Sequence, residues 1–600
     1  MKSARTPATL GSLSRPLRYL RARFRHDDFW ISAAAALLGL ICGVSVSAFD
    51  WIVKHVQLLA FGLGMGEVSG AGRIPLDRIW VPAAGGAALG VTIWLGARLR
   101  RYIQTVDPIE ANATTGGRIP LPGAIWIMLQ TILSHGSGAS VGMEGAHTQM
   151  CSALGSRAGQ WASGRRMDMR LMVACGAGAS IAAIFQSPIA GAFYAFELVV
   201  AAYSIANLAP VAIAALVAAG TRALLRPAPL NFPTSGFTLL PETVLVALSI
   251  TILTSFMAIG VMRACTWLEA GVSRRLPGWL SPMLGGVALG ALALASPAAL
   301  SSGRTALQGL YGQEVLWLSV LGILVLKAVA VTLSVGTGFR GGLSFASLFL
   351  GLLCGKLVAA LLQMVGGTAL SPELCELVGM TAFSTAIIGA PLAMAFLVSF
   401  ASQDMSNVIP MVCVATVANL LVRRYFGYSF ATWRFHLRGD PIRSGADMSF
   451  LSNLKVGEMM RRDATPVLYS TDLAQFRKRY PPGSRYRVVV TDHDGIYLGV
   501  LSVPELHNPA SDGKEMEDLL RHRDEYLTPE MTAPEALKRF TAIGTDALAV
   551  IDRDSRKALG VLMEPYVLRR CAELSEQRMR EIFEERGAHG PAGKAVKRGV

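Results

Sequence analysis

Charged side chains are scarce in this 600-residue sequence, and that scarcity excludes a soluble chain. Only 16% of the residues are charged and 52% are hydrophobic, whereas soluble domains carry about 25% charged residues. From Leu171 to Gly220 the only charged side chain is Glu197, and residues 377–403 contain none. Segments of this composition are solvated by lipid. The sequence therefore predicts a polytopic membrane protein.

Several chemical signatures are also absent. The eight cysteines form no C-x-x-C pair, which argues against a zinc site or a disulfide framework. No H-E-x-x-H motif occurs, and Gly351 to Lys356 fails the P-loop pattern because Leu357 stands where serine or threonine is required. Residues 1–28 contain arginines but no apolar h-region, so no cleavable signal peptide is expected there. We expect no metal, no organic cofactor and no enzymatic activity.

The formal net charge of +15 raises the alternative of a nucleic-acid-binding protein. The basic residues, however, lie in short segments between apolar runs, as at 15–25, 98–101 and 165–166. The positive-inside rule predicts this distribution for cytoplasmic tails and loops. We therefore expect a multi-pass protein of the inner (plasma) membrane with both tails cytoplasmic, and no nucleic-acid partner.

The chain changes character near residue 440. We expect a basic N-terminal tail (1–28), a membrane domain (29–440), a linker (441–453), a small α/β domain (454–572) and a charged C-terminal tail (573–600). The apolar segments of the membrane domain are 29–60, 79–97, 122–134, 168–224, 243–269, 279–299, 315–337, 341–364 and 373–422. Some are shorter than the ~20 residues of a simple span, and glycine or proline interrupts others. Short, broken helices are typical of channels and transporters.

A weak internal repeat supports this interpretation. The segment 186–190 is echoed at 389–393, and Gly142 to Gly145 has a glycine-rich counterpart at Gly341 to Ser344. The order is the same in both halves of the domain. We therefore predict an all-α fold of two inverted repeats built from short, broken, tilted helices, with a site at their junction.

Glu144 is the acidic side chain at that junction. It lies in the small-residue run from Ser137 to His147, where an ionisable group is costly unless it faces a cavity or a partner. The flanking glycines permit close backbone approach, and a helix start there presents free amides and a positive dipole to an anion. A carboxylate at the same place would compete with that anion and leave when protonated.

Two alternatives from other functional classes remain open at this stage. Gly138 to Gly142 satisfies G-x-S-x-G, so an intramembrane hydrolase could use Ser140 as nucleophile with His135 or His147 as base, although no strand precedes the motif. A transporter for another solute could use similar inverted repeats.

At these residues the sequence resembles the CLC family of chloride channels and chloride/proton exchangers, which has four pore motifs. The family's G-S-G-I-P matches Gly116-Gly117-Arg118-Ile119-Pro120, and its G-K/R-E-G-P matches Gly142-Met143-Glu144-Gly145-Ala146. Its N-A-P-L-A-G segment matches the run from Ala174 to Gly191, and its G-x-F-x-P motif is degraded in the run from Gly341 to Ala346. The resemblance covers residues 30–440 and implies an anion site formed mainly by backbone amides at 118–120, 144–146 and 343–345, including Leu343, Ser344 and Phe345.

The departures from the family bear on mechanism. The gating glutamate is retained as Glu144, but the anion-contacting serine falls on Gly117 and the inner tyrosine on Ala431, with Tyr428 and Phe430 close by. The inner proton-relay glutamate falls on Leu198, one residue after Glu197, which remains a candidate relay. The resemblance implies a homodimeric, voltage-gated chloride channel with one pathway in each protomer, and the departures favour conduction over proton-coupled exchange.

The tail resembles a pair of CBS modules. Residues 487–502 and 547–562 each predict a strand, a turn and a second strand, with a helix at 534–540 before the second copy. Where such modules hold a nucleotide's ribose with Thr and Asp, this sequence has Ser502 and Glu505, then Met563 and Tyr566. These substitutions argue against an adenine-nucleotide site.

Overall fold

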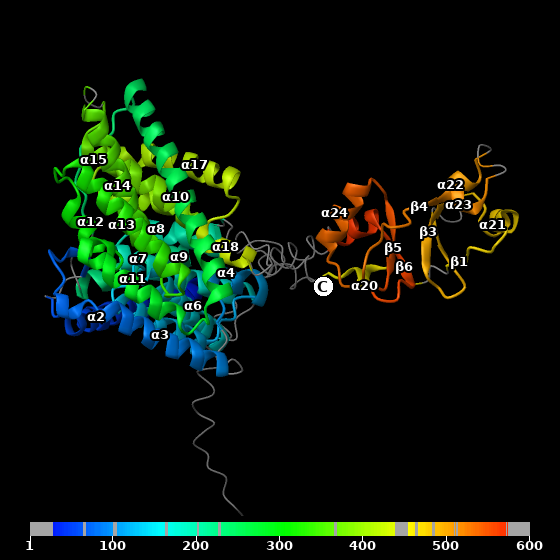
Figure 1. Ribbon diagram of the computed structural model, residues 1–600, viewed down its shortest axis with the longest axis horizontal. Coiled ribbons are helices and arrows are strands. Elements are labelled where there is room, and N and C mark those ends of the chain that lie inside the picture. Colours follow the sequence, from blue (N-terminus) through cyan, green and yellow to red (C-terminus); the bar gives the residue numbers. More distant parts are fainter. Residues whose placement is uncertain are drawn as a thin grey trace, which may run out of the picture. The chain divides into compact units, whose positions relative to one another are not determined.

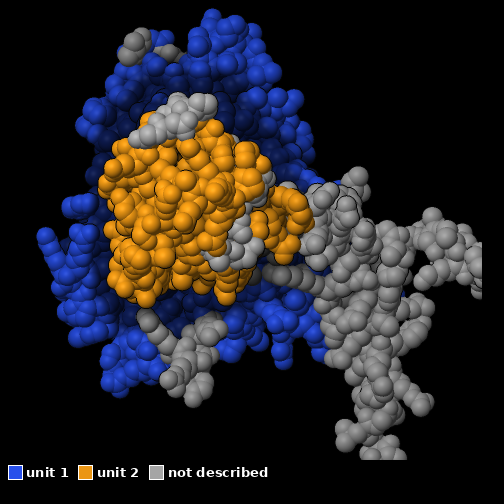
Figure 2. All heavy atoms as spheres, turned by 90° about the vertical axis from the view of Figure 1, so that its right-hand side faces the viewer, with its two compact units in different colours: residues 1–447 blue, residues 448–600 orange. Residues whose placement is uncertain are grey.

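The structure is a computed structural model. The structure describes residues 28–63, 68–99, 105–162, 166–200, 203, 205–225, 230–364, 366, 369–437, 454–462, 466–482, 487–508, 511, 514–571 and 573. Most of the expected N-terminal tail, the linker 441–453 and nearly all of the expected C-terminal tail lie outside these residues. The chain divides into two compact units, Met1–Asp447 and Met448–Val600, which are coloured separately in Figure 2.

The first unit is a bundle of helices that differ widely in length and tilt (Figure 1). Its helices are α2 (Asp28–Phe61), α3 (Val81–Arg98), α4 (Pro108–Glu110), α5 (Leu121–Gly136), α6 (Glu144–Trp161), α7 (Arg166–Phe185), α8 (Pro188–Tyr194), α9 (Ile205–Leu225), α10 (Pro241–Arg275), α11 (Ser281–Ala295), α12 (Arg304–Leu310), α13 (Trp317–Gly336), α14 (Ser344–Met364), α15 (Pro372–Ile388), α16 (Pro391–Ala401), α17 (Val408–Tyr425) and α18 (Phe430–Leu437). The π-helices η3 (Ala111–Thr115) and η4 (Ala195–Val200) continue α4 and α8, and 3-10 turns η1 (Val68–Gly70), η2 (Leu76–Arg78), η5 (Pro297–Ala299) and η6 (Met405–Asn407) lie in connections. Proline occupies the first turn of several of these helices, where its missing N–H has no intrahelical acceptor to lose.

Eight helices among the described residues are long and apolar enough to cross a membrane. Two of them form the interior: the apolar windows of α7 and α14 are 89% and 72% buried, whereas the other six are 28–39% buried. The less buried helices expose large apolar side chains, such as Leu59 on α2 and Trp267 on α10. Exposed apolar surface of this extent suits contact with lipid chains, so the membrane prediction is confirmed.

One segment of the first half of this unit recurs in the second half, 200 positions later. The segment P-x-x-G-G-x-A-L-G occurs at 82–90 in α3 and again at 282–290 in α11. The two helices pack closely and reciprocally: a Cβ at Gly86 would meet the Pro282 carbonyl, and a Cβ at Gly286 would meet the Pro82 carbonyl. Small residues permit such close approach of helices in a membrane.

The loops before α6 and α14 obey the same relation. Gly142 and Gly342 exchange two backbone hydrogen bonds of 2.8 Å as an antiparallel bridge. The Ser140 N–H donates to the Ser334 hydroxyl at 2.9 Å, and the Arg340 N–H donates to the Ser134 hydroxyl at 3.0 Å. The halves therefore meet in opposite directions, as the inverted-repeat prediction requires.

The second unit is a small α/β domain with an internal duplication. Its elements are α20 (Val456–Met459), β1 (Val467–Leu468), α21 (Leu473–Arg479), β2 (Arg487–Thr491), β3 (Tyr497–Ser502), α22 (Val503–Leu506), α23 (Met516–Leu519), β4 (Leu520–Arg521), α24 (Ala533–Ile543), β5 (Ala547–Ile551) and β6 (Ala558–Met563). One sheet has the order β1-β2-β3-β4, with β1 parallel to β2 and the other pairs antiparallel, and β5 pairs with β6.

Both hairpins of this unit carry a register shift at matching places, between Val490 and Thr491 and between Val550 and Ile551. Side chains from both hairpins share one small apolar core, which includes Val489, Val500 and Ala549. The predicted strands and the predicted helix before the second hairpin are confirmed. The duplication is consistent with the CBS-like pair.

Candidate functional site: a carboxylate between two cavities

Glu144 is the first residue of α6, and only 3% of its surface is exposed. Its side chain reaches across to the other half of the unit, where Oε1 accepts a hydrogen bond of 3.2 Å from the Phe345 N–H. Phe345 is the second residue of α14, so this amide has no carbonyl acceptor within its own helix. The carboxylate therefore lies at a positive helix start, a position that favours a negative charge.

Two glycines make room for this carboxylate. A Cβ at Gly142 would meet both carboxylate oxygens of Glu144, and a Cβ at Gly342 would meet Oε2 and the Gly145 nitrogen. These are the residues that pair the two loops. Glycine is therefore required at both positions for the carboxylate to occupy this place.

Glu144 separates two cavities. The Asp50 cavity, about 160 Å³, is lined by Glu144 together with residues of α2, α5, α6, α12 and Phe345. The central cavity, also about 160 Å³, is lined by Glu144 and by the starts of α6 and α14, including Gly145, Leu343 and Ser344. Glu144 is the residue common to both linings, so it lies between the two cavities.

A third cavity continues the series. The Arg340 cavity, about 450 Å³, shares Asp107, Ala431 and Arg434 with the central cavity. The three cavities thus follow one another through the first unit, and Glu144 lies between the first and the second.

One wall of the central cavity is formed by residues that were not predicted from the sequence. Asp107, Pro108 and Ile109 line the cavity, whereas Gly116 to Pro120 are absent from its lining. Asp107 precedes α4 and accepts a hydrogen bond of 2.8 Å from the Ile109 N–H. This corrects the expected position of the first motif.

Residues 116–120 lie at the opposite end of the helical segment 108–115. Gly116 and Gly117 have φ of 67° and 83°, which terminates a helix rather than starting one. The Ile119 N–H donates to the Ser156 hydroxyl at 2.9 Å, so this amide is already bound. Arg118 is exposed and does not point into the central cavity.

Ala431, on which the family's inner tyrosine falls, lines the central cavity as expected. Phe430 and Ala431 both line the central cavity, and Tyr428 does not. A tyrosine from another helix, Tyr194 of α8, lines the same cavity. Ala146, expected to contribute an amide, is 2% exposed and is not among the lining residues of the central cavity.

Glu197 has a different environment from Glu144. Its carboxylate accepts hydrogen bonds from the Leu392 N–H at 2.9 Å and the Ala393 N–H at 3.0 Å, at the start of α16. Neither Glu197 nor the buried Leu198 lines the central cavity; Val199 does so instead. Glu197 therefore joins η4 to α16.

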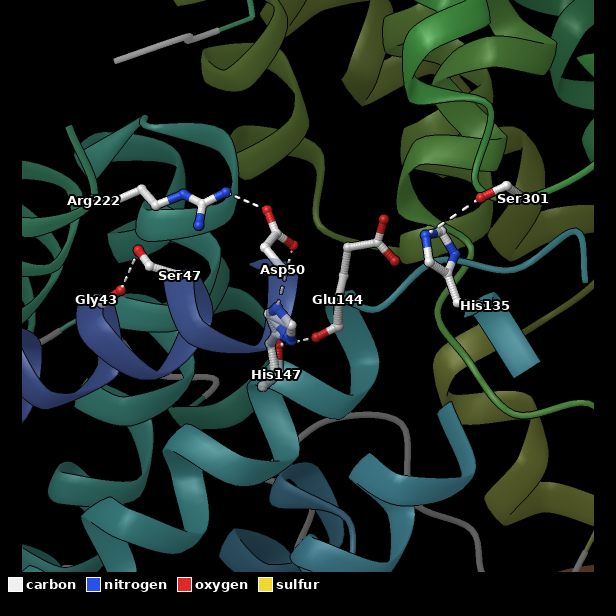
Figure 3. A network of polar contacts seen from close by, with 9 residues as sticks. Gly43, Ser47, Asp50, His135, Glu144, His147, Arg222 and Ser301 are labelled. Carbon is white, nitrogen blue, oxygen red and sulfur yellow. Dashed lines mark hydrogen bonds and ion pairs between the residues drawn. The ribbon is translucent and has the colours of Figure 1, made fainter. Parts of the chain in front are cut away.

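A network of buried polar side chains adjoins Glu144 on the side of the Asp50 cavity (Figure 3). Asp50 of α2 forms an ion pair with Arg222 of α9, and Nε2 of His147 lies 3.9 Å from Oδ1 of Asp50. His147 is one turn after Glu144 in α6 and is 1% exposed. These three residues are far apart in the sequence, and no motif or spacing indicates them as a group.

The geometry removes the hydrolase alternative. Ser140 is fully buried, and His135 donates from Nδ1 to the Val141 carbonyl at 2.7 Å, with Nε2 3.3 Å from the Ser301 hydroxyl. His147 faces Asp50 instead. A serine nucleophile needs a base within hydrogen-bond reach, and neither of the proposed bases fills that role.

Comparison with known proteins is consistent with this geometry. The family model described as voltage-gated chloride channel matches residues 93–423, which is more than half of the chain. The chain belongs to this family. Its CLC membership confirms the resemblance inferred from the pore motifs.

The matches to individual relatives extend over most of each relative's length. A ClcB-like chloride channel protein of Ralstonia nicotianae is 30% identical over 396 residues, covering 63% of this chain and 90% of the relative. A slow cyanobacterial Cl⁻/H⁺ antiporter of known structure has a TM-score of 0.60 at 19% identity and covers 69% of this chain and 98% of its own. A eukaryotic CLC transporter has a TM-score of 0.59 at 17% identity and covers 92% and 98%, respectively. The structural likeness establishes the CLC fold.

Proposed function

We propose that the chain transports chloride across the membrane through a pathway formed by the three cavities, and that protonation of Glu144 opens this pathway. The observation that carries the proposal is the hydrogen bond from the Phe345 N–H to Oε1 of Glu144. The carboxylate oxygen stands where an anion would accept that amide. Ionised, Glu144 closes the partition between the Asp50 and central cavities; neutral, it no longer competes with the anion.

Chloride flux from liposomes that contain the purified full-length protein tests this function. We expect flux that increases as the pH falls, because protonation releases the Phe345 amide. A transporter for another solute would leave chloride flux at the level of empty liposomes.

The mode of transport that we propose is passive conduction, in a homodimer with one pathway in each protomer. We place the protein in the inner membrane of the cell, with both tails in the cytoplasm. Two observations support conduction: the inner glutamate of exchangers is replaced by Leu198, and the carboxylate of Glu197 is bound at the start of α16. For the CBS-like pair we propose a packing role and no nucleotide binding.

Proton-coupled exchange is a second candidate, favoured by one specific observation. Asp107 and Glu144 line the same central cavity, so a second carboxylate is available to a proton entering from the Arg340 cavity. The reversal potential at symmetric chloride under a proton gradient distinguishes the two modes. Conduction predicts a reversal potential of zero. Exchange predicts a reversal potential that shifts with the proton gradient as a fixed stoichiometry requires, and Asp107→Asn should abolish this shift.

A further inference from the structure

Arg118 lies outside the central cavity, and its backbone is firmly held. The Ser156 hydroxyl donates to the Gly117 carbonyl at 2.7 Å and accepts a hydrogen bond of 2.9 Å from the Ile119 N–H. Gly117, Ile119 and Ser156 are buried, whereas Arg118 between them is exposed. The fold therefore fixes a guanidinium on the outer surface of the unit, just before α5 begins.

The end of α3 lies beside the start of α5. The side-chain amide of Gln130 in α5 donates to the Thr92 hydroxyl of α3 at 3.2 Å, and a Cβ at Gly96 would lie 3.1 Å from the Trp126 indole nitrogen. The partner numbers fall along α5 as they rise along α3, so the two helices are antiparallel. Less than one turn further on, Arg98 lies level with the first turn of α5.

Arg98 is the second exposed arginine at this end of the two helices. Its guanidinium carbon lies 3.8 Å from the centroid of the Trp94 ring, one turn earlier in α3. Indoles are typical of the membrane–water interface, and the cation–π contact holds the guanidinium there. Neither Arg98 nor Arg118 forms an ion pair with a carboxylate in the part of the chain that the structure describes. Both charges are therefore available to an anion from outside the chain.

The outer surface of the same two helices is apolar further from the arginines. The apolar window that includes α3 is 28% buried, the lowest share among the eight candidate spans of the described residues, and α3 lies at the edge of the bundle in Figure 1. Large apolar side chains are exposed on both helices: Val91 and Leu95 on α3, and Ile125 and Leu129 on α5. An apolar surface that ends at two cations matches the acyl chains and the charged headgroup of an anionic lipid.

The position of this surface in the chain indicates which leaflet it faces. α2 and α3 are consecutive candidate spans, so the end of α3 lies on the same side of the membrane as the N-terminal tail. That tail has five arginines between residues 15 and 25, and the positive-inside rule places it in the cytoplasm. The cytoplasmic leaflet is the one whose anionic lipids attract basic residues next to the membrane.

We infer that Arg98 and Arg118 bind the phosphate of an anionic phospholipid of the cytoplasmic leaflet, whose acyl chains lie along the exposed apolar side chains of α3 and α5. Guanidinium N–H groups bind phosphate oxygens through charge-assisted hydrogen bonds, and two arginines provide enough donors for one phosphate. Neither arginine lines the Asp50, central or Arg340 cavity, so the lipid site is separate from the proposed pathway. The inference therefore holds whether or not the chain conducts chloride.

Native mass spectrometry of the full-length protein in detergent, titrated with phosphatidylglycerol, tests the site. The dissociation constant of the first bound lipid should rise about fivefold in Arg98→Gln and about fivefold in Arg118→Gln, because each variant removes one basic residue from the headgroup. The double variant should show a rise of about 25-fold if the two charges act independently.

A control variant and two control ligands sharpen the test. Arg73→Gln removes an exposed arginine from the connection at the other end of α3 and should leave the dissociation constant unchanged. Phosphatidylcholine has a phosphate but no net charge, and the parent protein should bind it about tenfold more weakly than phosphatidylglycerol. Inorganic phosphate at the concentration of the lipid should not displace phosphatidylglycerol, because it makes no contact with the apolar surface.

Three results would overturn the lipid site. The first is phosphatidylglycerol binding that is unchanged in both Arg98→Gln and Arg118→Gln. The second is equal affinity of the parent protein for phosphatidylglycerol and phosphatidylcholine, and the third is displacement of the lipid by inorganic phosphate, which would assign the arginines to a free anion. If Arg118→Gln does not fold, Arg98→Gln and the charge-retaining Arg98→Lys decide the question, since only the first should weaken binding about fivefold.

Discussion

The loop that leads into α6 and the loop that leads into α14 share a backbone but not a chemistry. Both end in the glycines that pair the two halves, and each backbone binds a serine of the other half, Ser334 or Ser134. At the next corresponding positions, 200 residues apart, the first loop has Glu144 and the second has Ser344. The duplicated frame thus supplies two similar helix starts. One carries the titratable side chain, and the other supplies the amide that the side chain binds.

Removing the charge from one loop should have the largest effect. Glu144→Gln should raise chloride flux at alkaline pH by about tenfold or more and abolish its pH dependence, because a neutral amide does not displace an anion as a carboxylate does. Flux at stepped pH measures this. Ser344→Ala, the corresponding change in the other loop, should keep the parental pH profile. A Gln variant that also keeps it would refute the gate.

Filling the space for the carboxylate should have the next largest effect. Gly342→Ala places a Cβ against Oε2 of Glu144 and the Gly145 nitrogen. We expect a loss of about 1–3 kcal/mol of stability from overpacking, together with leakage at alkaline pH. Thermal unfolding in detergent and basal flux measure the two effects. Gly322→Ala is the control, since a Cβ at Gly322 has no neighbour within 4 Å, and equal behaviour of the two variants would contradict the account.

Glu197, which is half-buried, should differ in kind from the buried Glu144. Glu197→Gln weakens the acceptor for the Leu392 and Ala393 amides, which should cost about 1–3 kcal/mol of stability and leave the reversal potential under a proton gradient unchanged. Glu242→Gln, in the exposed first turn of α10, should have no effect on stability. A reversal potential that depends on Glu197 would assign it to proton transfer instead.

The smallest effects should come from the shared frame. Ser134→Ala and Ser334→Ala each remove one acceptor for an amide of the opposite loop, and each should cost about 1 kcal/mol. If the frame is symmetric in energy as well as in geometry, the two losses are equal. Ser249→Ala, whose exposed hydroxyl bonds only within α10, serves as the reference. A large loss from one serine and none from the other would contradict the symmetry.

The sequence predicted the parts of the site that depend on local pattern. Glu144, the paired glycine loops and the starts of α6 and α14 follow from small residues around one acid and from an internal echo. The P-x-x-G-G-x-A-L-G repeat at 82–90 and 282–290 is a further sequence signal of the two halves, and it was not among the patterns used for the prediction.

The first motif was misplaced for a physical reason. The Ile-Pro pair at 119–120 resembles the family's motif, but Gly116-Gly117 ends a helix, whereas Asp107-Pro108 has an N-cap acceptor followed by proline in the first turn. Helix polarity therefore distinguishes the two segments. The Asp50, His147 and Arg222 network could not be predicted in this way, because its members come from three helices and meet only through tertiary packing.

The central claim is that the Glu144 carboxylate occupies the place of an anion at the start of α14. An experimental structure of Glu144→Gln in bromide, with the anion located by anomalous scattering, tests this claim most directly. We expect a bromide within hydrogen-bond distance of the Phe345 N–H, with the side chain at position 144 displaced from that amide. A glutamine still bound to the Phe345 amide, with no bromide beside it, would contradict the account.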